Sequence, residues 1–274
     1  MNFVQLKITC NPELGEILVA ELSQIQFDSF EETKEGLSAA CDESVWDEKE
    51  ATQILNKYGV EYNIAIVPQV NWNEEWEKHY DPVKVGDQIF IGATFHTFPS
   101  GYKYYLRINP KMSFGTGHHA TTSQVLEAQL EVDHQNKRVL DVGCGTGVLS
   151  ILASQLGAAH ITAIDIDEWC IENSLENFAL NQCKNIDLRL SEIDEIQKAK
   201  PFDIILANIN RNVLLEQMAD YAARLVAGGY LLMSGFYRED VEALIKSAET
   251  NGLYLVFERS RDKWAILLMK KGES

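Results

Sequence analysis

Four short stretches of the sequence contain residues whose types and spacing could bind a cofactor or carry out chemistry. The first is FGTGHHATT, Phe114 to Thr122, in which two adjacent histidines and two adjacent threonines follow two glycines. It could be half of a metal site, a phosphate-binding loop or a flap over a cofactor. Nothing within the stretch decides between these three, so the decision depends on the sequence around it.

The second stretch, KRVLDVGCGTGVLSI, predicts a strand, a glycine turn and a helix. Gly143, Gly145 and Gly147 follow Asp141, and we expect the missing side chains to let a cofactor lie against the backbone where the helix begins. A nicotinamide-binding loop has the spacing G-x-G-x-x-G, which would require glycine where this chain has Val148. The spacing G-x-G-x-G behind an acidic residue therefore disfavours an oxidoreductase.

The third and fourth stretches each place a polar side chain at the end of a predicted strand. HITAIDIDEW predicts a strand ending at Asp165, whose carboxylate can accept hydrogen bonds from both hydroxyls of a ribose, whereas Asp167 is expected to cap the next helix. PFDIILANIN predicts a strand over Asp203–Ala207 with Asn208 at its tip. An amide there can accept a hydrogen bond from a substrate amine, although an asparagine taken by itself is better explained as a loop or capping residue.

Alternating helix and strand patterns from about residue 114 onward predict the α/β sheet that brings these stretches to one edge. The start of the chain instead predicts the order βαββαβ, which is typical of a small ferredoxin-like α+β sandwich. Between the two, NWNEEWEKHYD places Trp72 and Trp76 on one face of a predicted helix. We therefore expect a ferredoxin-like domain at 1–68, a linker helix at 69–85 and a cofactor-binding domain at 86–274.

The composition argues against several classes of protein. At 274 residues the chain is long enough for two domains, each with its own core. No apolar run approaches the roughly 18 residues of a membrane span and no signal-peptide pattern opens the chain, so we expect a cytoplasmic protein without membrane contact. The five cysteines contain no Cys-x-x-Cys pair, which predicts reduced core residues. The net charge of −17 argues against direct nucleic-acid binding.

The negative charge is concentrated at the start of the chain. Residues 1–68 carry 4 Lys and Arg against 13 Asp and Glu, which is 4 − 13 = −9. Such a run is explained by a solvated surface, or alternatively by an acidic face that docks a basic protein. The charge alone leaves both interpretations open.

Taken together, these features resemble one family along nearly the whole chain. The acidic N-terminal sandwich, NWNEEWEKHYDPVKVG, FGTGHHATT, DVGCGTGVLSI, AIDID, LANI and DKWAILLMKK are similar to PrmA, the bacterial methyltransferases that modify large-subunit ribosomal protein eleven. The resemblance implies a class I methyltransferase with a doubly wound Rossmann-like sheet and S-adenosyl-L-methionine as cofactor. It implies methylation of lysine side-chain and N-terminal amines of that basic ribosomal protein, docked by the acidic domain. The alternatives are an N-methyltransferase of another protein or small amine, and a non-catalytic adenosylmethionine-binding protein.

The resemblance also implies roles for individual residues. Thr122 is expected to contact the methionine end of the cofactor and Asp165 the ribose, while Asn208 is a cofactor contact and the candidate catalytic residue. The remaining cofactor-binding candidates belong to the glycine loop: Asp141, Gly143 and Gly145. The adenine-contacting residue is undecided, with Glu192 as a guess. After LANI the family commonly has Leu-Ala, whereas this chain has Asn210 and Arg211, so local substrate contacts are expected to differ.

No metal site is expected. Adjacent residues on a helix point about 100° apart, and no Cys or carboxylate lies at ligand spacing near His118 and His119. We expect FGTGHHATT to be a flap, with Gly115 and Gly117 giving a flexible entry to a helix that begins near His118. The free N–H groups of that helix and Thr122 would face the methionine carboxylate.

Overall fold

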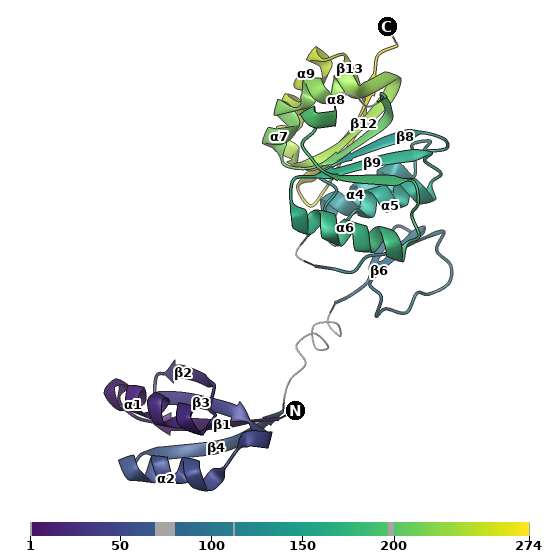
Figure 1. The fold of residues 1–274 in the computed structure, drawn as a ribbon. Coiled ribbons are helices and arrows are strands. Elements are labelled where there is room, and N and C mark those ends of the chain that lie inside the picture. The colour runs from purple at the N-terminus through teal and green to yellow at the C-terminus, as the bar shows by residue number, and fades with distance from the viewer. Residues whose placement is uncertain (1, 69–79, 112, 197–199, 274) are drawn as a thin grey trace. The chain divides into compact units, whose positions relative to one another are not determined.

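The computed structural model describes residues 2–68, 80–111, 113–196 and 200–273. The chain divides into two compact units, Met1–Tyr80 and Asp81–Ser274, which are described separately (Figure 1). Most of the predicted linker helix, residues 69–79, lies outside the described residues. Val83–Val85, at the end of that prediction, form strand β5 of the second unit, so the linker helix does not extend over them.

The described part of the first unit is an antiparallel sheet covered by two helices that contact each other. Its strands lie in the order β2-β3-β1-β4, and Leu6, Leu18 and Leu55 are fully buried between sheet and helices. The elements follow the predicted βαββαβ order: β1 (Asn2–Thr9), α1 (Pro12–Leu22), β2 (Ser29–Thr33), β3 (Gly36–Asp42), α2 (Glu48–Tyr58) and β4 (Glu61–Pro68).

Local sequence signals fix the helix ends in this unit. Asn11 accepts a hydrogen bond from the N–H of Leu14 at 2.9 Å and is followed by proline, so α1 begins there. Asp47 caps α2 by accepting from Lys49 N–H at 2.8 Å, and Gly59 ends it with φ of +63°.

The second unit contains a mixed seven-stranded sheet in the order β10-β9-β8-β11-β12-β14-β13. The first five strands are parallel to their neighbours, whereas β14 runs antiparallel to both β12 and β13. The strands are β8 (Arg138–Val142), β9 (His160–Asp165), β10 (Ile186–Leu190), β11 (Phe202–Asn208), β12 (Leu225–Tyr237), β13 (Leu253–Arg261) and β14 (Trp264–Lys271). This confirms the predicted doubly wound α/β architecture.

Helices cover both faces of this sheet (Figure 1). Along β11, Ile204 and Leu206 point into one core, while Ile205 and Ala207 point into the other, which explains the continuous apolar run in the sequence. One face packs against α4 (Ala120–Gln129), α5 (Val148–Gln155) and α6 (Glu168–Leu180), and the other against α7 (Arg211–Glu216), α8 (Met218–Arg224) and α9 (Val241–Thr250).

A small three-stranded sheet precedes α4 in the chain. It is formed by β5, β6 (Ile89–Gly92) and β7 (Tyr104–Arg107), and its Ile89, Ile91 and Leu106 join the core around α4 and α5. In the described residues no helix is long and apolar enough to cross a membrane.

Candidate functional site

The carboxyl ends of β8, β9 and β11 meet at one edge of the large sheet. Val142 pairs with Ile164 on one side and with Ala207 on the other, so the next residues along the three strands are Gly143, Asp165 and Asn208. The sequence predicted this meeting from strand ends alone, and the register confirms it.

The glycine loop between β8 and α5 is shaped by protein atoms. Gly143, Gly145 and Gly147 have φ of +69°, +57° and +77°, which other residues adopt poorly. A Cβ atom on Gly145 would lie 2.3 Å from the carbonyl oxygen of Phe114, and one on Gly143 would lie 2.4 Å from Ile209 Cγ2. In the direction of the missing side chains these two glycines are therefore packed against the protein, and both also line the cavity described below.

Asp165 is nearly buried at the end of β9 and holds the glycine loop. Its Oδ2 accepts a hydrogen bond from the Gly145 N–H at 2.9 Å, and its Oδ1 accepts from the Asp167 N–H at 3.1 Å. Each oxygen keeps a lone pair for a further donor. Asp167 caps α6 by accepting from the Trp169 N–H at 2.8 Å, which is the role predicted for it.

Asn208 ends β11 beside the first turn of α4. Its Nδ2 donates a weak hydrogen bond to Thr122 Oγ1 at 3.4 Å, across 86 positions of sequence. Its Oδ1 is buried and has no hydrogen-bond partner among the described residues. A buried acceptor without a donor is costly, so this oxygen is suited to a donor brought by a ligand.

FGTGHHATT is bonded to the glycine loop. The Thr146 N–H donates to the Phe114 carbonyl at 2.9 Å, and its hydroxyl donates to the Gly115 carbonyl at 2.6 Å. His118 Nε2 lies 2.9 Å from the Asp81 carbonyl oxygen. Hydrogen bonds therefore hold both ends of the glycine pair in this structure, and the flexibility predicted for Gly115 and Gly117 stays a prediction.

His119 is the N-cap of α4, which begins at Ala120, within two residues of the predicted start near His118. Its Nδ1 accepts from the Thr121 N–H at 3.3 Å, so this histidine uses one of the free N–H groups that were expected to face a ligand. Its ring lies edge-on to Trp264, with centroids 4.7 Å apart. Trp264 in turn stacks on Tyr237 at 4.3 Å. Sequence reasoning missed this aromatic group, because Tyr237 and Trp264 are brought together by the pairing of β12 with β14, and His119 reaches them from α4.

A cavity of about 820 Å³ lies at the strand edge, and His119 and Trp264 belong to its wall. Thr122, Gly143, Gly145, Asp165 and Asn208 all belong to its wall. Glu192, the guessed adenine contact, lies there too. Among the described residues the wall contains no Lys or Arg, whereas its carboxylates are Asp165, Glu192, Asp194, Glu216 and Asp220.

Asp141 does not line the cavity. It is fully buried behind the loop, where its Oδ2 accepts from the Ser150 hydroxyl at 2.7 Å and its Oδ1 has no partner among the described residues. Burial raises the pKa of Asp141 to about 7. Its position favours support of the loop from behind over contact with a ligand.

The described residues contain no group of three or more His, Cys, Asp and Glu arranged to hold a metal ion. His118 and His119 instead bind to different neighbours, a backbone carbonyl and a helix end. Burial raises the pKa of the Cys144 thiol in the glycine loop well above its ordinary value, so this cysteine is a neutral packing residue.

Known proteins of one family match nearly the whole length of this chain. The sequence profile of the family described as "Ribosomal protein L11 methyltransferase (PrmA)" matches residues 3–272. The chain is 40% identical over 274 residues to the "Ribosomal protein L11 methyltransferase" of Phocaeicola vulgatus, spanning 97% of this chain and 98% of that protein. It is 44% identical over 258 residues to the protein of the same name from Porphyromonas gingivalis, spanning 92% of this chain and 89% of that protein.

A solved structure shows the same fold. The crystal structure titled "ribosomal protein L11 methylase" from Lactobacillus delbrueckii subsp. bulgaricus superposes with a TM-score of 0.66, at 24% identity, over 70% of this chain and 100% of that one. With the profile match and the two relatives, the result is unambiguous. The chain belongs to the ribosomal protein L11 methyltransferase (PrmA) family.

Proposed function

We propose that this protein uses S-adenosylmethionine to methylate lysine side-chain and N-terminal amines of ribosomal protein L11. Its family and the names of its curated relatives support the substrate and the reaction. The observation that carries the proposal is the buried Oδ1 of Asn208, which has no partner among the described residues and belongs to a residue of the cavity wall. A ribosomal substrate also implies that the reaction takes place in the cytoplasm.

The chemistry of the cavity wall fits the cofactor. Asp165 keeps a lone pair on each carboxylate oxygen after holding the loop, which suits two ribose hydroxyls. Gly143, Gly145 and Thr122, at the loop and at the first turn of α4, would border the methionine half. The carboxylates of the wall favour a cationic molecule, and the cofactor's sulfonium is cationic.

S-adenosylmethionine, when bound, supplies a methyl group on a sulfonium that is already an activated leaving group. The protein must then hold a neutral amine in line with that methyl group. At pH 7.4 deprotonating a lysine side chain costs about 4 kcal/mol, whereas deprotonating an α-amine costs under about 1 kcal/mol. Asn208 Oδ1 can accept one amine hydrogen and orient the lone pair without the full charge that would stabilise the ammonium.

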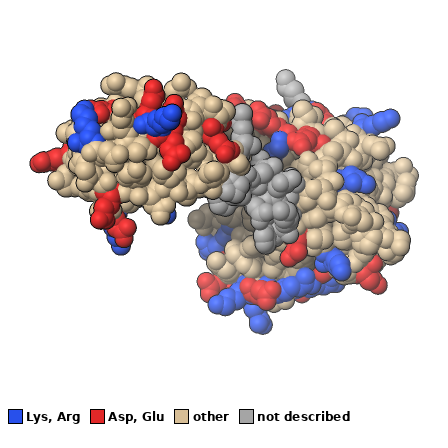
Figure 2. Space-filling model, turned by 90° about the horizontal axis from the view of Figure 1, so that it is seen from below, with Lys and Arg blue, Asp and Glu red and all other residues tan. Residues whose placement is uncertain are grey.

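We further propose that residues 1–68 recognise the substrate. In the view of Figure 2, acidic side chains are scattered over the first unit with some basic ones among them, and both kinds also occur on the second. The net charge of −9 over this segment suits a basic ribosomal protein and disfavours direct contact with nucleic acid.

The test is Asn208→Ala, assayed with radiolabelled S-adenosylmethionine and purified ribosomal protein L11. We expect kcat to fall by about 100-fold or more, while calorimetry gives a cofactor Kd within about threefold of wild type. Asn212→Ala is the control, because Asn212 is an exposed asparagine on α7 outside the cavity wall. Equal losses of transfer and cofactor affinity would contradict the role of Asn208. Methylation of other proteins or small amines, but not of L11, would contradict the substrate.

A further inference from the structure

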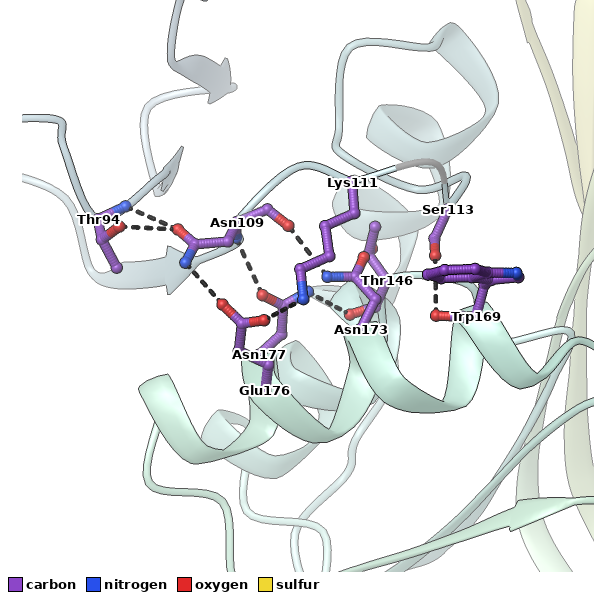
Figure 3. A network of polar contacts seen from close by, with 9 residues as sticks. All are labelled: Thr94, Asn109, Lys111, Ser113, Thr146, Trp169, Asn173, Glu176 and Asn177. Atoms are coloured by element: carbon purple, nitrogen blue, oxygen red, sulfur yellow. Dashed lines mark hydrogen bonds and ion pairs between the residues drawn. The ribbon is translucent and has the colours of Figure 1, made fainter. Parts of the chain in front are cut away.

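A row of asparagines on α6 binds backbone atoms of another segment. Asn173, Asn177 and the C-cap residue Asn181 are four residues apart and lie on one helix face. Asn181 accepts from the Arg107 N–H at 2.9 Å and donates to the Arg107 carbonyl at 2.7 Å. Asn177 accepts from the Asn109 N–H at 2.9 Å, and Asn173 donates to the Asn109 carbonyl at 3.2 Å (Figure 3). These side chains make the bonds that a neighbouring strand would otherwise make.

Asn177 differs from Asn181 because its amide also reaches the glycine loop. Its Nδ2 donates to the Thr146 carbonyl at 2.9 Å (Figure 3). Thr146 donates its own N–H and hydroxyl to the carbonyls of Phe114 and Gly115. Asn177 and Thr146 are both fully buried, so water does not replace these bonds. All three polar groups of Thr146 are thus committed, one to α6 and two to FGTGHHATT.

We propose that Asn177 is a positioning residue for the methionine half of the cofactor site. It does not line the cavity, so it acts through Thr146. By donating to the Thr146 carbonyl, Asn177 orients the N–H and hydroxyl of Thr146, which bind the carbonyls of Phe114 and Gly115. The chain segment that begins with these two residues continues to Thr122 in the cavity wall. The adenosine half depends on Asp165, which is held by the N–H groups of Gly145 and Asp167. Asn177 therefore affects one half of the site more than the other. This inference rests on the proposed cofactor.

The structure offers a matched pair of variants. Asn177→Asp keeps the shape and the acceptor for the Asn109 N–H but replaces the donor to Thr146 with an oxygen. Asn181→Asp makes the same change one turn later, where the lost donor faces the carbonyls of Arg107 and Asn177, outside the glycine loop. Two ligands separate the halves of the site: S-adenosylhomocysteine contains both, whereas methylthioadenosine lacks the amino-acid part.

Calorimetric titration of the full chain measures both ligands. We expect Asn177→Asp to weaken S-adenosylhomocysteine at least about tenfold and methylthioadenosine less than about threefold, and Asn181→Asp to leave both within about threefold. Unchanged S-adenosylhomocysteine binding to Asn177→Asp, or equal loss of both ligands, would overturn the inference. A wild-type chain that bound neither ligand would overturn the proposed function first.

A second variant covers poor folding of Asn177→Asp. Thr146→Val removes only the hydroxyl that donates to Gly115, with little change in volume. The same selective loss of S-adenosylhomocysteine affinity is expected, with the melting temperature measured in parallel. If Asn177→Asp does not fold and Thr146→Val binds both ligands as wild type does, the bonds between the glycine loop and FGTGHHATT do not affect ligand binding, and the inference fails.

Discussion

Asp141 is a carboxyl group that folding removes completely from water. Burial raises its pKa to about 7, so the folded state favours the protonated form at pH values where the unfolded chain has lost that proton. Below the ordinary value near 3.8 both states are protonated and folding is not penalised. As the pH rises from there to about 7, this group lowers the free energy of unfolding by up to about 4 kcal/mol.

Asp141→Asn removes this titration and keeps an acceptor for the Ser150 hydroxyl. The free energy of unfolding of the variant, relative to that of wild type, should therefore increase by about 3 kcal/mol as the pH rises from 5 to 8. Urea unfolding at both pH values measures the difference. A gain of equal size at pH 5 and pH 8 would show that Asp141 is ionised in the folded protein at both.

At the scale of single residues, the sequence predicts side chains that follow strand ends and misses those that act through tertiary contacts. Asp165 and Asn208 could be located because a strand fixes where its last residue points. Their chemical roles stay predictions. Asn177 lies in the last turn of α6, asparagine has low helix propensity, and the partners of its side chain are 31 and 68 positions away. The four-residue spacing of Asn173, Asn177 and Asn181 indicates a polar helix face, but the neighbouring sequence does not identify the residues that this face binds.

The glycine loop and FGTGHHATT act as one structural element. A Cβ atom on Gly145 would lie 2.3 Å from the Phe114 carbonyl oxygen, so a side chain there must displace the partner of the Thr146 N–H. Gly145→Ala should weaken S-adenosylhomocysteine binding at least about tenfold, because the wall formed by Phe114 and Gly115 moves. Calorimetry measures the affinity, and thermal unfolding measures the accompanying loss of stability.

Gly252→Ala is the matched control for this variant. Gly252 has φ of +77° and nothing within 4 Å of its missing Cβ, so alanine there carries the strain of a left-handed conformation without a close contact. We expect it to lose about 1 kcal/mol of stability and to bind the ligand as wild type does. If both variants bound S-adenosylhomocysteine as wild type does, the contact between the glycine loop and FGTGHHATT would not determine the shape of the site.

At the scale of elements, periodicity predicted the strands and helices well and their contacts less well. The βαββαβ order and the parallel strands follow from hydrophobic patterns that one chain segment contains. The capping role of His119 was not predicted, because accepting from the Thr121 N–H at a helix start is more typical of Ser, Thr, Asp or Asn. The hydrogen bonds that hold FGTGHHATT were not predicted, because they depend on Thr146, 31 positions beyond Gly115.

At the scale of the whole molecule, the two units divide the net charge unequally. The first 68 residues carry −9 of the total of −17. Surface charges of one sign speed and strengthen encounter with an oppositely charged protein, and salt weakens the effect over about 10 Å. Docking of a basic substrate by this unit therefore predicts a Michaelis constant that rises with ionic strength, while a small amine substrate shows less dependence.

Neutralising exposed acids of the first unit tests this directly. The triple variant Glu16→Gln, Glu31→Gln and Glu32→Gln removes three negative charges from α1 and β2. We expect KM for ribosomal protein L11 to rise about threefold to tenfold at low salt, with kcat and the cofactor Kd unchanged, because the cavity belongs to the second unit. The control removes the same charge from exposed residues of the second unit outside the cavity wall: Glu242, Glu249 and Glu258. Equal changes in KM for the two triple variants would mean that net charge, and not the first unit, attracts the substrate.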